Sequence, residues 1–266
     1  MRLHRSLSAG NKRTLLLSLV VTAVLSVLPI SSHAAIFWDD EMELNNTGFG
    51  FPQGQSCGGA NSFNYDSTQK VSGNGSIRLD YSGANNCGGF ADRSYYPGTA
   101  DLYTRFYIRL SPNWVTSPVV TKITRSDTSG PNSNWWSMLW GSTTLMVGAQ
   151  NVPTIGSTVN LYSSFSFARG VWYCVETQEQ LGTSGATNGV IRAWVNGNQV
   201  QNVTGVQFRQ PGDNSLYVNK RMYRQEGTGS IWYDRMAVGN SRIGCLGSVP
   251  ASDSTPPTPP VGLTVR

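Results

Sequence analysis

The segment from Trp172 to Cys245 constrains the fold more than any other part of this 266-residue chain. Three runs within it, of which 190–195 is the clearest, alternate side chains in the manner of half-buried β-strands. The run at 190–195 is followed by Asn196-Gly197, a dipeptide that favours a tight β-hairpin turn. Charged residues make up only 13% of the chain, and clusters of Gly, Asn, Ser and Pro separate further short alternating runs. The sequence therefore predicts an all-β fold.

Twelve candidate strands can be recognised between residues 36 and 238, and so many strands in one domain predict two packed sheets. The clearest strand is 102–110. Its residues Leu102, Thr104, Phe106, Ile108 and Leu110 share the face that we expect in the core. The other face carries Tyr103, Arg105, Tyr107 and Arg109. Alternating Tyr and Arg suit stacking on sugars and bidentate contact with anionic ones, and a solvated face with local cation–π pairs explains the pattern equally well.

The first 34 residues have the pattern of a secretory signal peptide. Basic residues up to Arg13 precede an apolar run at 15–30, and Ser32-His33-Ala34 supplies a small-x-small cleavage site. A membrane anchor is the alternative, because the apolar run is close to the length needed to span a bilayer. Pro29 and the small residues after it favour cleavage. We therefore expect bacterial export to the periplasm or the medium, with no membrane attachment after cleavage.

Removal of the signal peptide changes the charge and the chemistry of the chain. The remainder has 16 basic and 15 acidic residues and no basic tail, so nucleic acid is not an expected partner. Both histidines, His4 and His33, also lie in the signal peptide. Their loss excludes Ser-His-Asp and Cys-His catalysis and histidine-based zinc sites in the mature protein.

The four cysteines predict two disulfides, because an even number of cysteines in an exported chain is typical of disulfide bonding. They are Cys57, Cys87, Cys174 and Cys245, and three pairings are possible. We favour Cys57–Cys87, since both residues precede Gly-Gly, together with Cys174–Cys245, which encloses the strand-rich segment. The spacings match no zinc motif.

Two stretches of the chain resemble the concanavalin A-like jelly-roll superfamily. Gly170-Val-Trp172 with Glu176, followed by Asn188-Gly and Trp194-Val-Asn196-Gly197, is similar to the pattern G-x-W-x-x-x-E … D-G-x-x-x-x-W-x-D-G of that superfamily. The residues around 101–114, 223–224, 232–234 and 241–244 resemble strands of its secreted polysaccharide-lyase branch, which includes heparin, glucuronan and alginate lyases. The resemblance covers roughly residues 36 to 245 and implies a two-sheet antiparallel jelly-roll sandwich.

This resemblance also defines the expected domains. We predict a signal peptide at 1–34, a jelly-roll domain at 35–248, and a Pro/Thr-rich linker with a disordered tail at 249–266. The chain departs from the pattern at Asn188 and Asn196, where aspartate is usual. Lyases of the branch commonly pair a histidine with a tyrosine, and the mature chain has no histidine. Glu176 and Glu179 are three residues apart and face opposite sides of a strand, so they cannot act as a glycosidase pair.

Three functions are compatible with these residues: glycan binding without turnover, which we rank first, a polysaccharide lyase, and a structural or adhesive surface domain. A lyase that cleaves by β-elimination needs a base, an acid and a group that neutralises the uronate carboxylate. We predict Tyr223 as base or acid and Arg105, Arg109 and Gln178 as carboxylate clamps, although Tyr223 also fits an ordinary strand aromatic.

An extracellular polysaccharide is the expected partner if the protein binds glycans or cleaves them as a lyase. Stacking and hydrogen bonding to sugars suit aromatic, cationic and amide side chains on an outward face. The predicted carbohydrate-binding residues are Tyr103, Tyr107, Trp172, Glu176, Arg192, Trp194, Lys220 and Arg224. We expect no cofactor, although Ca²⁺ is possible, with oxygen ligands from Asp39, Asp40, Glu41 and Glu43.

Overall fold

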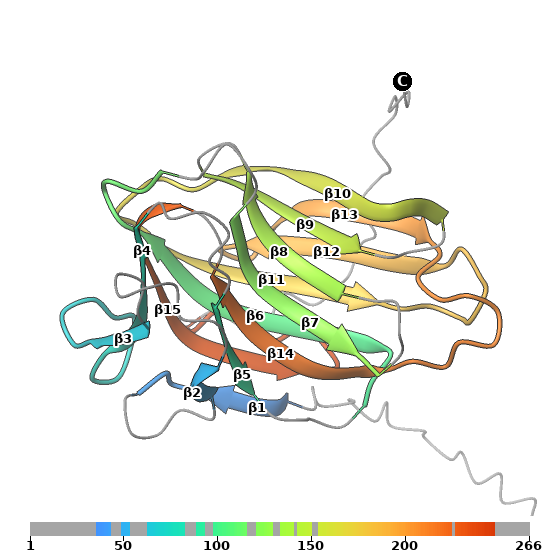
Figure 1. Ribbon diagram of the computed structural model, residues 1–266, viewed down its shortest axis with the longest axis horizontal. Coiled ribbons are helices and arrows are strands. Elements are labelled where there is room, and N and C mark those ends of the chain that lie inside the picture. Colours follow the sequence, from blue (N-terminus) through green and yellow to red (C-terminus); the bar gives the residue numbers. More distant parts are fainter. Residues whose placement is uncertain are drawn as a thin grey trace, which may run out of the picture. The chain divides into compact units, whose positions relative to one another are not determined.

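The computed structural model describes the chain between residues 36 and 247 with gaps, and its described residues form β-strands and connecting turns (Figure 1). The described ranges are 36–43, 49–53, 63–82, 89–93, 98–115, 121–129, 134–140, 143–150, 154–224 and 227–247. Within them, no helical stretch has the length and hydropathy that crossing a bilayer requires. The predicted signal peptide, C-terminal tail and Cys57–Cys87 disulfide lie outside the described residues.

One sheet, called sheet A here, contains eight of the described strands in the order β13-β12-β11-β6-β15-β4-β3, with β1 also paired to β15. These strands are β1 (Ile36–Asp40), β3 (Phe63–Asp66), β4 (Ser76–Ser82), β6 (Asp101–Leu110), β11 (Trp172–Gln180), β12 (Gly189–Val195), β13 (Asn198–Val206) and β15 (Thr228–Gly239).

The second sheet, sheet B, contains the other seven described strands in the order β10-β9-β8-β7-β14-β5-β2. They are β2 (Phe49–Gln53), β5 (Gly89–Arg93), β7 (Thr121–Thr128), β8 (Asn134–Trp140), β9 (Thr144–Gln150), β10 (Thr154–Ser166) and β14 (Tyr217–Arg224). All strand pairings among the described residues are antiparallel.

The two sheets pack face to face over one hydrophobic core. Phe106 and Val175 of sheet A and Met222 of sheet B belong to the same cluster of buried side chains. The Tyr233 hydroxyl of β15 crosses the core and donates a hydrogen bond to the backbone oxygen of Ile123 in β7, at 2.9 Å. The two-sheet antiparallel sandwich predicted from the sequence is therefore confirmed.

The local predictions that depend on regular alternation are also confirmed. The predicted core face of β6 is buried, from Leu102 at 0% exposed to Leu110 at 1%. β12 and β13 form a hairpin in which Asn196 and Gly197 have φ values of 50° and 82°. Such positive values at two successive turn residues explain why Asn-Gly occurs here. The predicted disulfide between Cys174 and Cys245 is present.

Three described strands, β2, β3 and β5, were not predicted from the sequence. β2 contains a glycine and a proline, which are depleted in strands, and β3 has only four residues. β5 begins at Gly89 and contains aspartate, which strands also disfavour. Their pairing with neighbouring strands, rather than their own alternation, defines them.

Candidate functional site

The C-terminal segment, residues 240–247, is anchored on the outer face of sheet A. Glu176 of β11 lies on that face, because its neighbour Val175 points into the core. Its carboxylate accepts hydrogen bonds from the Arg242 Nε at 3.0 Å and from the backbone nitrogens of Ile243 at 2.7 Å and Gly244 at 3.2 Å. The Cys174–Cys245 disulfide attaches the same segment to the same strand.

This segment contacts several side chains that were predicted to bind sugars. The Tyr107 hydroxyl accepts a hydrogen bond from the backbone nitrogen of Leu246 at 2.6 Å. The Arg242 guanidinium lies 4.0 Å from the centroid of the Trp194 ring. Trp194 is only 5% exposed and Tyr107 8% exposed. Both face outward from the sheet as predicted, but the fold uses them and Glu176 to attach the C-terminal segment.

The neighbouring predicted residues form an intramolecular network. Tyr103 stacks on Trp194, with ring centroids 6.4 Å apart. Gln178, which is 3% exposed, donates to the Asp101 carboxylate at 3.0 Å and accepts a hydrogen bond from Arg192 at 2.8 Å. Arg192 is partly exposed, and so is Trp172 at the start of β11. Trp172 is therefore more exposed than the other three predicted aromatic residues of sheet A, Tyr103, Tyr107 and Trp194.

Two of the predicted carboxylate clamps also have partners within the protein. Arg105 is 4% exposed, and its Nη2 lies 3.0 Å from Asp39. Arg109 donates to the backbone oxygen of Gly170 at 3.0 Å, and its guanidinium lies 5.2 Å from the Trp232 ring centroid. The interpretation of this face as a solvated surface does not hold for Arg105, although the expected cation–π contact exists at Arg109.

The structure places the predicted acid or base in the other sheet. Tyr223 and Arg224 belong to β14 of sheet B, opposite Phe90 and Gly89 of β5, and their side chains lie outside the described part. Arg105, Arg109 and Gln178 belong to sheet A. The four predicted catalytic residues are therefore not brought together in one sheet.

Lys220, which was predicted to bind carbohydrate, faces the core. It is 1% exposed, and its ammonium group donates to the Ser126 hydroxyl of β7 at 2.9 Å. The reason is strand alternation: Lys220 shares the inward face of β14 with Met222. A side chain in this position has no route to a sugar on the outer face of the sheet.

A polar cluster occupies the outer face of sheet B where β7 and β14 pair. Arg125 is opposite Arg221, and Asp127 is opposite Asn219. The Asp127 carboxylate lies 2.7 Å from the Arg125 Nε and 3.0 Å from the Arg221 Nε. All three charged side chains are partly exposed, at 15–22% of their surface. We call Lys122, Arg125, Asp127, Asn219 and Arg221 the sheet B cluster.

The sheet B cluster has an excess of positive charge. The pKa of Lys122 is lowered, first by burial and then by the positive charge of Arg125, so the two cations are close enough to repel each other. Asp127 is the acidic residue of the cluster and is shared by two arginines. Arg221 is also the cross-strand partner of Asp92 in β5. Partly exposed arginines beside a carboxylate can still bind an anionic group of a ligand.

Sequence reasoning missed this cluster because a β-bulge interrupts β7. Its pairing with β8 shifts register between Lys122 and Thr124, so alternation is not continuous along the strand. The alternation of Arg125 and Asp127 with Ser126 is the local signal in the sequence that points to a common outer face for the two charged residues.

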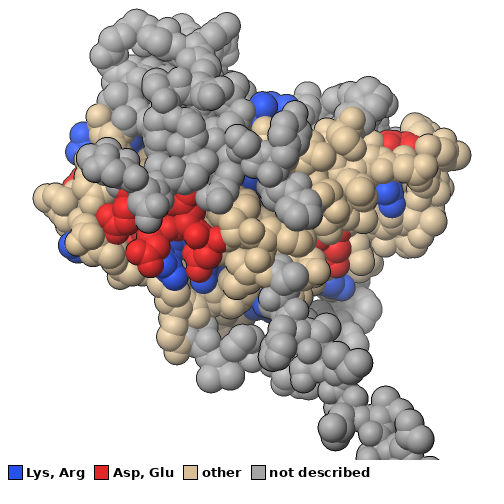
Figure 2. Space-filling model, turned by 90° about the horizontal axis from the view of Figure 1, so that it is seen from below, with Lys and Arg blue, Asp and Glu red and all other residues tan. Residues whose placement is uncertain are grey.

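The carboxylates predicted as calcium ligands are used in other contacts. The lower face of the molecule as drawn in Figure 1 carries acidic side chains beside basic ones (Figure 2). Arg235 pairs with Glu41 and lies 3.3 Å from Asp39, while Asp40 accepts a hydrogen bond from the backbone two residues later. In the described part of the chain, no group of three or more His, Cys, Asp or Glu side chains is arranged to bind a metal. The predicted set of four therefore does not fit a calcium ion.

A second acidic site lies where the loop at 71–74 meets β15. The Asp234 carboxylate accepts hydrogen bonds from the backbone nitrogens of Val71 at 2.6 Å and Ser72 at 3.2 Å. Burial raises the pKa of Asp234 to about 6, and the charge of Glu43 contributes to the shift. Glu43 accepts hydrogen bonds from the Tyr65 hydroxyl at 2.9 Å and from the Asn74 backbone nitrogen at 2.6 Å. The two carboxylates therefore attach this loop to the sheet.

The sequence matches no protein-family model, and no curated protein is similar enough to be a relative. Solved structures do share the fold. An endo-β-1,4-glucuronan lyase from the fungus Trichoderma reesei superposes with a TM-score of 0.61 at 16% identity, covering 77% of this chain and 95% of that one.

Two further solved proteins have the same architecture. The PL-14 alginate lyase from Aplysia kurodai gives a TM-score of 0.59 at 10% identity, covering 78% of this chain and all of that one. The cellulose-induced protein Cip1 gives 0.56 at 17% identity, covering 78% and 99%. At these identities the likeness establishes the fold alone, and the expected antiparallel jelly-roll sandwich is confirmed.

Proposed function

We propose that this protein is exported and binds an acidic, uronate-containing polysaccharide on the outer face of sheet B. The observation that carries the proposal is the sheet B cluster, in which Arg125 and Arg221 both pair with the carboxylate of Asp127 and the charge of Arg125 acts on Lys122. An arginine can bind a carboxylate through two parallel hydrogen bonds. A row of uronate carboxylates would meet Arg125 and Arg221 here, whose side chains are 21% and 22% exposed, whereas Arg105 is only 4% exposed.

Two other observations support the proposal. The solved proteins that share the fold include enzymes named as glucuronan and alginate lyases, whose substrates are polymers of uronates. The Cys174–Cys245 disulfide is typical of proteins in oxidising compartments and agrees with export.

Isothermal titration calorimetry with β-1,4-glucuronan and alginate oligosaccharides tests the binding function. We expect Arg221→Ala and Arg125→Ala each to weaken binding by about tenfold, the effect of losing one charge-assisted hydrogen bond. Arg192→Ala changes an arginine in sheet A and serves as the matched control. Unchanged affinity in both sheet B variants, or equal losses in all three, would contradict the proposal.

The second candidate is a polysaccharide lyase that acts at the same face. Its supporting observation is the position of Tyr223, two residues beyond Arg221 on β14. In β-elimination a base removes the C5 proton of the uronate, the C4–O bond breaks, a C4–C5 double bond forms, and an acid protonates the leaving oxygen. Arg221 or Arg125 would neutralise the carboxylate, and tyrosine would serve as base and acid.

Ultraviolet absorbance of the unsaturated uronate distinguishes the two candidates. A rise in absorbance on glucuronan or alginate that is lost in Tyr223→Phe, with binding retained, would establish cleavage. Binding without any rise would establish recognition alone. Failure to bind any acidic glycan would favour the third expectation, a structural or adhesive surface domain.

A further inference from the structure

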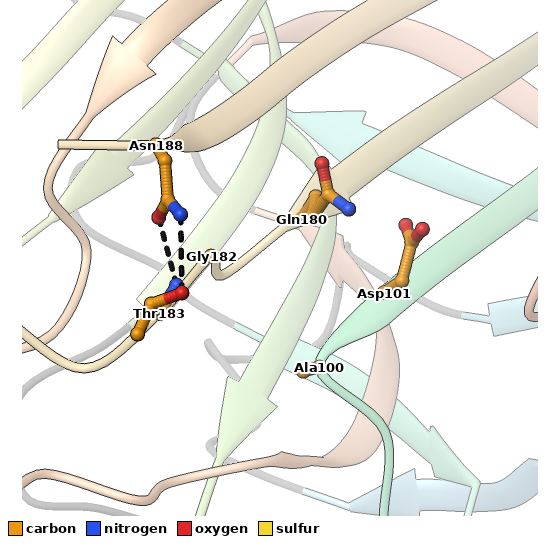
Figure 3. Close-up of a pocket in the computed structure, with 6 residues that line it drawn as sticks. All are labelled: Ala100, Asp101, Gln180, Gly182, Thr183 and Asn188. Atoms are coloured by element: carbon orange, nitrogen blue, oxygen red, sulfur yellow. Dashed lines mark hydrogen bonds between the residues drawn. The ribbon is translucent and has the colours of Figure 1, made fainter. Parts of the chain in front are cut away.

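A small polar pocket lies where the start of β6 and the end of β11 in sheet A meet the β11–β12 connection. It has a volume of about 230 Å³ and is lined by Ala100, Asp101, Gln180, Gly182, Thr183 and Asn188 (Figure 3). Pockets for drug-sized ligands have volumes of roughly 300–1,000 Å³, so this one fits a single small unit. Its lining contains polar side chains and one alanine methyl group, and it includes no cation and no aromatic ring.

One wall of the pocket is a carboxylate held in a fixed position. Gln178 donates through Nε2 to both oxygens of Asp101, at 3.0 and 3.3 Å, and is itself held by Arg192. Gln180 is the cross-strand partner of Asp101, and the two side chains lie next to each other at the pocket (Figure 3). The Asp101 carboxylate, a hydrogen-bond acceptor, and the Gln180 amide therefore lie side by side at the pocket.

The opposite wall is equally well fixed. The Asn188 side chain accepts a hydrogen bond from the Thr183 backbone nitrogen at 2.7 Å and donates to the Thr183 hydroxyl at 3.1 Å. Gly182 has a φ of +69°, and a Cβ there would overlap the Asn188 side chain. Glycine is thus required at this position for the loop to approach Asn188. Both walls are set before any ligand arrives, which reduces the entropy lost on binding.

The chemistry of the lining selects its ligand. A carboxylate accepts hydrogen bonds from hydroxyl groups, and the Gln180 amide can donate and accept. Burial raises the pKa of Asp101, which agrees with limited access of water to its carboxylate. A uronate would meet repulsion from Asp101, because the six lining residues include no cation and Arg192, whose charge acts on Asp101, is held by Gln178 and Asn202.

We propose that the pocket binds one neutral, hydroxylated sugar unit through Asp101 and Gln180, as a second glycan site separate from the sheet B cluster. The two sites would have opposite preferences, because the sheet B cluster favours carboxylates and this pocket disfavours them. The proposal does not depend on the function proposed for sheet B.

Cellotriose and the β-1,4-glucuronan trisaccharide form a matched pair of probes, since they share a linkage and differ in the C6 carboxylate. We expect cellotriose to shift the ¹H–¹⁵N amide signals of Gln180, Gly182 and Thr183, with a Kd on the order of 1 mM, as expected for a small polar site. Under the same conditions the glucuronan trisaccharide should leave these three signals in place.

Single substitutions then test whether the residues lining the pocket bind the sugar. Asp101→Ala and Gln180→Ala should each weaken cellotriose binding by about tenfold, while Asp213→Ala, a change of an acidic residue outside the pocket lining, should leave it unchanged. Gln180 is partly exposed, so Gln180→Ala tests the site even if Asp101→Ala fails to fold. Absence of shifts with cellotriose, equal shifts with the glucuronan trisaccharide, or full affinity in Gln180→Ala would overturn the proposal.

Discussion

Glu179 of β11 and Lys220 of β14 interact across the core of the sandwich, although they belong to different sheets. Burial raises the pKa of Glu179 and lowers the pKa of Lys220, and their mutual attraction opposes both shifts. Lys220 also donates to Ser126 of β7. The two charges are therefore coupled electrostatically through the core, while the hydrogen bond of Lys220 is made within sheet B.

Removing one member of this pair should destabilise the fold. Lys220→Met leaves the Glu179 carboxyl group buried without its cation, and we expect a loss of about 3 kcal/mol in the free energy of unfolding. The double variant Glu179→Leu/Lys220→Met removes both charges and should recover most of the loss. Urea denaturation measures both values. Wild-type stability in Lys220→Met would show that the pair does not contribute.

The Glu176 carboxylate should control the attachment of the C-terminal segment. Glu176→Gln removes the negative charge that receives Arg242 and two backbone nitrogens, so we expect a loss of about 2 kcal/mol in local stability. Hydrogen exchange at the amides of Ile243 and Gly244 should become roughly 30-fold faster. Asp213→Asn, which changes a carboxylate in a separate loop, is the control. Unaltered exchange at these two amides would refute the anchoring role.

Asp66 should make stability depend on pH in the acid range. Burial alone would raise its pKa, but hydrogen bonds from Thr68 and Trp232 and the charge of Arg78 lower it to about 2. The folded-state pKa lies below the unfolded value of 3.8, so its stabilisation is present above pH 3.8 and is lost as the pH falls towards 2. The full contribution is about 2 kcal/mol. The stability gap between wild type and Asp66→Asn should close over this pH range in chemical denaturation, and a constant gap would contradict the assignment.

The sequence predicted the fold well where side chains alternate without interruption. β6 and the β12–β13 hairpin follow from period-two patterns and from Asn196-Gly197, which encode local geometry. The pairing of Cys174 with Cys245 was one of three possibilities and was favoured because it encloses a strand-rich segment. Strands such as β2 that depend on a partner for their definition were missed.

The candidate site was less predictable, because alternation gives the face of a residue and not what covers that face. Tyr107, Glu176 and Trp194 face outward as expected, and a segment more than 45 residues later in the chain packs on them. Lys220 was predicted to bind carbohydrate, whereas it is buried in the core, where the charge of Glu179 from another strand attracts it. Contacts between residues so distant in sequence leave no local signal.

The anchoring of residues 240–247 on sheet A determines how the domain can be displayed. The chain passes residue 247 on the face turned away from the sheet B cluster. A surface or a fused reporter attached at residue 247 would therefore start from the side of the domain opposite to Arg125 and Arg221. Attachment at that residue suits a glycan-binding assay on a sensor chip.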